Sequence, residues 1–215
     1  MDFRELLRIP NLLSLSRIPL AFAVWYFVRF EDSTSIIIAA SLLTIAGITD
    51  GLDGYLARKQ GRITKLGIAL DPIADKIFAI ILVFALIVHR DFPVWLAVAV
   101  VGRDLLILVG GLFLSREKRV SLPSNMTGKY AFGMVSVLIA SYVIQYPFGI
   151  TIGTPIVVVL LTASTIGYAR VFYLVSRDRP VPPYEETPVR RILRLGFLYG
   201  FSAVYLVKLY LDLLR

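Results

Sequence analysis

Four aspartates stand close together in a chain that is otherwise rich in apolar residues. They occur in TDGLDGYLARKQGRITKLGIALDPIADK, residues 49–76, as the pairs Asp50 and Asp53, and Asp71 and Asp75. Such spacings place both members of a pair on one face of a helix. Carboxylate oxygens are the ligands that hard divalent cations such as Mg²⁺, Mn²⁺ and Ca²⁺ prefer. The pattern therefore predicts a cation site shared by two neighbouring, antiparallel helices.

The carboxylates need compensating positive charge. A charged side chain at the centre of a bilayer costs roughly 2.5–3.5 kcal/mol, and like charges raise each other's pKa. Arg58 and Lys76 are the local bases, but Lys76 lies about 100° round the helix from Asp75. Too few bases are expected to face inward, so bound cations are the favoured compensation. Two such ions close together would suit phosphoryl chemistry.

Two other readings of the aspartates stay open. They could be helix caps and interhelical ion pairs, although capping explains neither the carboxylate pairs on both helices nor the small residues between them. They could instead line the pathway of a cation or proton transporter. A transporter site is typically near the midplane between broken helices, whereas these acids gather at one edge of the membrane.

The elements that hold the aspartates are predicted from hydropathy. The chain of 215 residues is 57% hydrophobic, and its apolar runs of about 20 residues match the thickness of a bilayer core. The predicted fold is an all-α polytopic membrane bundle of six transmembrane helices, preceded by an interfacial amphipathic arm, DFRELLRI. The predicted spans are residues 11–30, 34–56, 67–89, 93–114, 129–148 and 152–175.

Basic residues gather on one side of the predicted bundle. That side collects Arg4, Arg8, Arg17, Arg58, Lys59, Arg62, Lys65, Arg116, Lys118, Arg119, Lys129, Arg177 and Arg179. The positive-inside rule then places the N-terminus and the aspartates on the cytoplasmic side, most simply of the inner membrane. The same asymmetry accounts for much of the net charge of +8, so no nucleic-acid partner is expected.

The composition changes after residue 176. SRDRPVPPYEETPVRR is a charged, proline-rich linker. Residues 192–214 are long enough to span a membrane but carry Arg194, Lys208 and Asp212. The expected division is a membrane domain over residues 1–176, followed by a linker and an additional hydrophobic helix over 177–215. That helix either spans the membrane or lies in its interface.

The aspartate segment resembles the motif of the CDP-alcohol phosphatidyltransferases. The matching positions are Asp50, Asp53, Gly54, Ala57, Arg58, Gly67, Asp71 and Asp75. The resemblance implies a homodimeric membrane enzyme with two divalent ions, Mg²⁺ or Mn²⁺. Such an enzyme transfers a phosphatidyl group from CDP-diacylglycerol to a small or lipid alcohol and releases CMP.

The resemblance also implies a role for each matching residue. Asp50 and Asp71 would bind both ions, Asp53 one ion and Asp75 the other, and Asp75 would be the general base for the acceptor hydroxyl. Contacts to the CDP-lipid are expected from Asn11, Ser14, Gly54, Ala57, Arg58, Thr64 and Gly67.

The acceptor alcohol is less sharply indicated. LDPIADK and VGRDLLI resemble the branch of phosphatidylglycerophosphate synthases and cardiolipin synthases. Arg103 is expected inside the bundle, either paired with Asp104 or binding the acceptor. Further acceptor contacts are expected from Arg116, Arg119 and Lys129, unless these are ordinary cytoplasmic loop charges.

One departure from the branch bears on this choice. The synthases that use glycerol 3-phosphate carry a second arginine about two turns beyond the Arg103 position, where this chain has LVGGLF. That departure favours phosphatidylglycerol as acceptor. Glycerol 3-phosphate nevertheless stays the expected acceptor, because the loop bases could supply a phosphate site.

Overall fold

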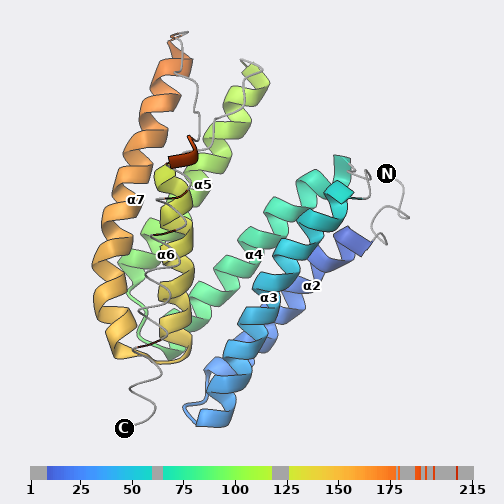
Figure 1. Cartoon of the computed structure of the whole chain (residues 1–215), viewed down its shortest axis with the longest axis vertical. Coiled ribbons are helices and arrows are strands. Elements are labelled where there is room, and N and C mark those ends of the chain that lie inside the picture. Colours follow the sequence, from blue (N-terminus) through green and yellow to red (C-terminus); the bar gives the residue numbers. More distant parts are fainter. Residues whose placement is uncertain are drawn as a thin grey trace. The chain divides into compact units, whose positions relative to one another are not determined.

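The structure is a computed structural model that describes residues 9–59, 65–117, 126–177, 179, 187–189, 192, 196 and 207. Within these ranges, side chains are described except at 9–10, 50–72, 112, 115–117 and 126. The regular elements of the described part are all helices (Figure 1): α2 (Ile9–Val28), α3 (Ser33–Lys59), α4 (Lys65–His89), α5 (Val94–Glu117), α6 (Met126–Val143) and α7 (Pro147–Ser176). They form two compact units, one with α2 to α4 and one with α5 to α7.

The helical class predicted from hydropathy is confirmed, and each predicted span overlaps one helix over most of its length. Three helical segments in the described part are long and apolar enough to cross a membrane: Asn11–Val28, Val94–Gly111 and Pro147–Ser176. The expected arm DFRELLRI lies outside the described residues. Most of residues 192–214 lie outside them too, so the course of the tail stays a prediction.

The predicted boundary between the last two spans is wrong. The spans predict one helix that ends at residue 148 and another that begins at residue 152, but α6 ends at Val143 and α7 begins at Pro147 and continues through Pro155. Proline is favoured in the first turn of a helix, where its missing N–H has no helical partner in any case. Gly153 is buried against α6, and a Cβ there would lie 3.1 Å from Leu138 Cδ1. These residues therefore serve helix entry and close packing.

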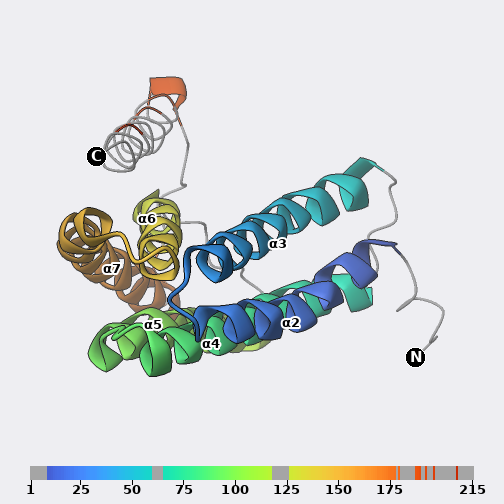
Figure 2. The ribbon, with the colours of Figure 1, turned by 90° about the horizontal axis from the view of Figure 1, so that it is seen from below.

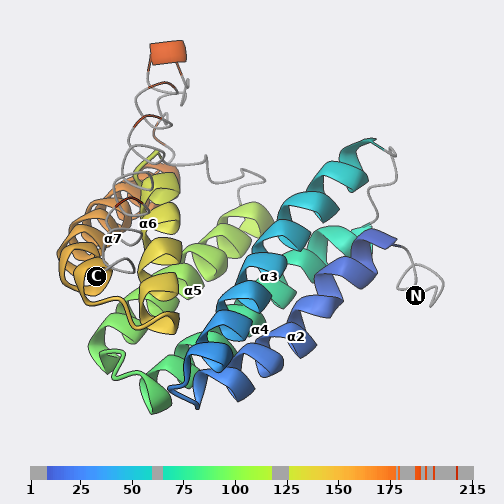
Figure 3. The ribbon, with the colours of Figure 1, turned by 60° about the horizontal axis from the view of Figure 1, so that its bottom comes forward.

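In the first unit, α2 packs against both α3 and α4 (Figures 2 and 3). The two helices α3 and α4 run in opposite directions (Figure 1). The end of α3 and the start of α4 therefore lie at one end of this unit, together with the start of α2. Both aspartate pairs belong to those helix ends.

Polar contacts join the helices at the other end of the same unit. Arg90 is buried and its Nη2 donates to the Phe30 carbonyl at 2.7 Å. Trp25 Nε1 donates to His89 Nε2 at 3.2 Å. Asp32 precedes α3, and its Oδ1 accepts the backbone N–H of Ser35 at 2.9 Å, an N-cap contact.

In the second unit, α5 packs against α7, and the two helices run in the same direction (Figure 1). Gly110 of α5 lies beside the ring of Phe172, where a Cβ would meet Cδ2 at 3.6 Å. The rings of Phe113 and Phe172 lie 6.4 Å apart. The absence of a side chain at residue 110 leaves space beside these aromatic rings.

Candidate active site

The four aspartates lie on helices, as the spacing predicts. Asp50 and Asp53 belong to the C-terminal part of α3, and Asp71 and Asp75 to the N-terminal part of α4. Only Asp75 has a described side chain, so the convergence of all four carboxylates remains a prediction. The backbone places both aspartate pairs at the same end of the first unit.

Asp75 has a basic partner that the sequence reading missed. Arg17 Nη1 of α2 forms a hydrogen-bonded ion pair with Asp75 Oδ1. The Arg17 side chain is buried, whereas the Asp75 side chain is 48% exposed. The carboxylate is thus held from the protein side while it remains open to a ligand.

Arg17 thus lies at the same end as the aspartates, but it is buried between helices. The number of inward-facing bases was therefore underestimated. The signal for its true position lies in the periodicity of α2. Buried residues recur along one face of this helix at Asn11, Ser14, Arg17, Ala21, Val24 and Val28. Their spacing of three or four residues marks a single face. The face is polar near the aspartates and apolar beyond Arg17.

Two of the expected CDP-lipid contacts belong to this face. Asn11 and Ser14 are buried, each with its own polar interactions. Gly54, Ala57 and Arg58 lie in the last turns of α3 and Gly67 in the first turn of α4, where side chains are not described. Thr64 lies outside the described residues. The buried polar residues of α2 fit a site for a polar ligand at this end of the unit.

The two divalent ions expected at the aspartates require a set of oxygen ligands. Among the described side chains, no three His, Cys, Asp or Glu residues come together as a metal site, and three of the four aspartates are not in that set. Four carboxylates near the end of α3 and the start of α4, one of them half-exposed, offer the hard oxygen donors that suit Mg²⁺ or Mn²⁺. The residues fit the expected ions, which stay a prediction.

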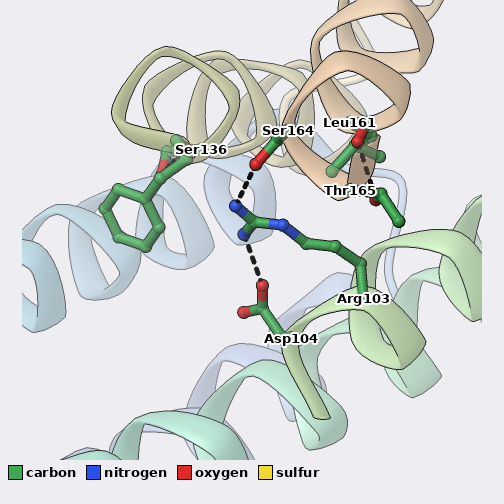
Figure 4. Close-up of polar contacts among 7 residues, drawn as sticks. Arg103, Asp104, Ser136, Leu161, Ser164 and Thr165 are labelled. Atoms are coloured by element: carbon green, nitrogen blue, oxygen red, sulfur yellow. Dashed lines mark hydrogen bonds and ion pairs between the residues drawn. The ribbon is translucent and has the colours of Figure 1, made fainter. Parts of the chain in front are cut away.

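Arg103 of α5 lies in the second unit and links α5 to α7 (Figure 4). Its Nη1 donates to Asp104 Oδ1 at 2.7 Å and its Nη2 to Ser164 Oγ of α7 at 2.6 Å. The guanidinium carbon lies 5.6 Å from the centre of the Tyr168 ring. The ion pair expected between Arg103 and Asp104 is therefore present, and α7 adds two contacts that the sequence did not reveal.

A groove of about 500 Å³ runs between α5 and α7 beside this arginine, a size common for ligand sites. Its walls are largely apolar and include Leu106, Gly110, Phe113 and Phe172. Arg103 also lines it, although its side chain is only 12% exposed. An anionic group that entered the groove would meet the guanidinium there.

The other expected acceptor contacts are less well described. Lys129 lies in the first turn of α6 and is half-buried, with a polar or electrostatic interaction of its own. Arg116 lies in the last turn of α5, where its side chain is not described. Arg119 lies outside the described residues. Their contribution to acceptor binding stays a prediction.

Comparison with known proteins identifies the class. Residues 7–177 match the model of the CDP-alcohol phosphatidyltransferase family. The match covers well over half of the chain, and the chain belongs to this family.

Three relatives illustrate the range of named activities. A CDP-diacylglycerol–glycerol-3-phosphate 3-phosphatidyltransferase of Aquifex aeolicus is 36% identical over 141 residues, which are 63% of this chain and 75% of that protein. Two proteins named cardiolipin synthase (CMP-forming), from Rattus norvegicus and Homo sapiens, are 37% and 38% identical over 119 residues. The matched segment is 55% of this chain but only 38% of either synthase.

Family membership decides between the two classes that the aspartates left open. The chain is a phosphatidyltransferase and therefore an enzyme, not a cation or proton transporter. Its apolar helices agree with an integral membrane protein of phospholipid biosynthesis.

Proposed function

We propose that this enzyme transfers a phosphatidyl group from CDP-diacylglycerol to glycerol 3-phosphate and releases CMP. The observation that carries the proposal is the placement of both aspartate pairs and the polar face of α2 at one end of the first unit. A lipid-linked nucleotide suits that arrangement, because its acyl chains can stay in the bilayer while its polar head meets acidic and polar residues.

In this proposal Asp75 accepts the proton of the acceptor hydroxyl. The hydroxyl oxygen forms a new bond to the phosphorus of the phosphatidyl group, and the bond from that phosphorus to CMP breaks. An ionised carboxylate is a pure hydrogen-bond acceptor, and Arg17 fixes its orientation from the buried side. Asn11 and Ser14 supply polar contacts for the CDP head, and Arg58 is suited to bind its diphosphate.

Asp50, Asp53, Asp71 and Asp75 would hold two divalent ions, Mg²⁺ or Mn²⁺, in the same proposal. Such ions neutralise phosphate oxygens and the charge that develops on a leaving phosphate. Aspartate is a weak base at neutral pH. Proton transfer to Asp75 therefore depends on polarisation of the acceptor hydroxyl by its surroundings.

Glycerol 3-phosphate is preferred as acceptor for two reasons. The relative from Aquifex aeolicus, whose name specifies that acceptor, matches over 75% of its length. Arg103 offers a guanidinium beside an accessible groove, and arginine binds phosphate well. Phosphatidylglycerol is the second candidate. The two cardiolipin synthases resemble the chain comparably in identity, and LVGGLF lacks a second arginine.

The proposal extends to topology and assembly. Six transmembrane helices follow from the apolar runs, and the cytoplasmic side of the aspartates follows from the distribution of basic residues. A homodimer follows from the family resemblance, and the mass of the detergent-solubilised protein by light scattering tests it.

An acceptor panel tests the proposed reaction. Detergent-purified protein receives CDP-diacylglycerol, Mg²⁺ or Mn²⁺, and in turn glycerol 3-phosphate, phosphatidylglycerol, inositol phosphate or serine. We expect CMP release that depends on glycerol 3-phosphate. Release only with phosphatidylglycerol would establish the second candidate, and no release with any acceptor would refute the transferase reaction.

A further inference from the structure

We propose that Ser164 and Tyr168 of α7 are positioning residues, which hold the guanidinium of Arg103 for the anionic group of the acceptor. This inference rests on the proposed role of Arg103 in acceptor binding. It adds to that role by naming the residues on another helix that make the arginine effective.

Ser164 differs from the other hydroxyl residues around it. Thr162 and Thr165 each donate to a carbonyl of their own helix at 2.8 Å, at Val158 and Leu161 respectively. A serine or threonine hydroxyl within a helix commonly donates such a hydrogen bond to the carbonyl of the preceding turn. Ser164 is fully buried, and its Oγ accepts a hydrogen bond of 2.6 Å from Arg103 instead (Figure 4).

The contacts of Arg103 fix the guanidinium from several directions. Asp104 binds Nη1 and Ser164 binds Nη2, while the Tyr168 ring lies 5.6 Å from the guanidinium carbon. A free arginine side chain has many rotamers, and ordering it on binding costs conformational entropy. Contacts made before the acceptor arrives remove that cost from the binding step.

Gly128 of α6 completes the arrangement by having no side chain. A Cβ at this position would lie 3.0 Å from Arg103 Nη2 and 3.3 Å from Tyr168 Cε2 and Oη. Gly128 is buried, so the displaced groups would have little room. The guanidinium therefore occupies space that a glycine on a third helix leaves open.

Arg103 lines the groove between α5 and α7, although its side chain is only 12% exposed. The other described lining residues of the groove are uncharged. An anionic ligand in this groove would thus find its positive partner at a fixed place. Removing the Ser164 hydroxyl should make the Arg103 guanidinium more mobile without removing its positive charge.

The test compares hydroxyl deletions at neighbouring positions. Initial rates of CMP release are measured with purified full-length protein, at varied concentrations of CDP-diacylglycerol and of the acceptor that the panel selects. We expect Ser164→Ala to raise the KM for the acceptor about fivefold, as for a weakened contact to a charged group. The KM for CDP-diacylglycerol and kcat should change less than about twofold.

Two variants serve as controls. Ser164→Thr keeps the hydroxyl and should restore the KM for the acceptor. Thr162→Val removes a hydroxyl that binds only its own helix, at an exposed position outside the groove, and should leave all constants unchanged. Equal changes for Ser164→Ala and Thr162→Val, or a rise in both KM values, would overturn the inference.

Variants of Arg103 separate this inference from the proposed function. If Arg103→Ala leaves the KM for the acceptor unchanged, the acceptor role of Arg103 is wrong and the positioning role falls with it. If Arg103→Ala raises that KM and Ser164→Ala does not, the positioning role alone is wrong. Melting temperatures of all variants in detergent identify any loss that reflects unfolding.

Discussion

Arg17 of α2 donates a hydrogen bond to the carboxylate of Asp75 in α4, across 58 positions of sequence. The arginine is buried and the carboxylate is half-exposed. This pair joins two helices at the end of the unit where both aspartate pairs lie. It also gives one of the four acids a permanent positive partner, which the aspartate pattern alone did not indicate.

Substitution of Arg17 should impair both stability and activity. Arg17→Met removes a charge-assisted hydrogen bond, which is worth about 1.5–3 kcal/mol when both partners are buried and less for a half-exposed carboxylate. We expect a lower melting temperature in detergent and at least about tenfold slower CMP release, because Asp75 loses its orientation. The exposed Arg29 provides the control. An Arg17→Met protein as stable and active as Arg29→Met would contradict this role.

Asp32 should stabilise the start of α3 in a pH-dependent way. Its pKa lies below the ordinary value because its carboxylate accepts hydrogen bonds from Ser35, first from the side chain and then from the backbone N–H. A depressed folded-state pKa means that the stabilisation is complete above the unfolded pKa of about 3.9 and is lost as the pH falls through the folded pKa.

Melting temperatures of two Asp32 variants test this cap. At pH 7, Asp32→Ala should melt below the wild type, whereas Asp32→Asn should stay close to it because asparagine also caps helices. Below about pH 4 the wild type should lose stability relative to Asp32→Asn, which has no carboxyl group to protonate. A difference between these two proteins that is constant from pH 3 to pH 7 would argue against the cap.

Gly128 should tolerate alanine poorly. Its added Cβ would press on the guanidinium of Arg103 and on the ring of Tyr168, so we expect a several-fold higher KM for the acceptor, similar to that of Ser164→Ala. Gly102→Ala is the matched control, because its Cβ would meet nothing within 4 Å. Gly128→Ala and Gly102→Ala with the same KM would show that the space beside Arg103 is not required.

Removal of divalent metal should abolish the reaction. Treatment of the purified protein with EDTA should stop CMP release, and added Mg²⁺ or Mn²⁺ should restore it. The reason is that four carboxylates that converge as we propose would repel one another without bound cations. Undiminished CMP release in EDTA would refute the proposed metal dependence.

The helices could be predicted from sequence because their signal is local. Apolar runs long enough to cross a bilayer lie between charged or turn-forming segments, and each became a helix. The boundary between the last two spans was misplaced because Pro147 and Gly153 are residue types that are common in turns. Their actual roles are helix entry and contact with Leu138, and these depend on a neighbouring helix that local patterns do not show.

The candidate sites were predictable to different degrees. The aspartate pairs stand out because an apolar chain rarely carries such charge, and the pairing of Arg103 with Asp104 follows from their adjacency in sequence. Ser164 and Gly128 come near Arg103 only through the packing of three helices. Arg17 was detectable, since it lies in phase with the buried residues of α2, but its charge suggested a surface position.

The account depends most directly on the carboxylate of Asp75, and one comparison tests it. CMP release from CDP-diacylglycerol and the selected acceptor is measured for Asp75→Asn and for Asp91→Asn, the same substitution in the exposed segment after α4. Asparagine accommodates the positive φ of 53° at residue 91, so this control should be fully active. We predict that Asp75→Asn folds but loses at least about a thousandfold in CMP release. A folded Asp75→Asn protein as active as Asp91→Asn would contradict the account.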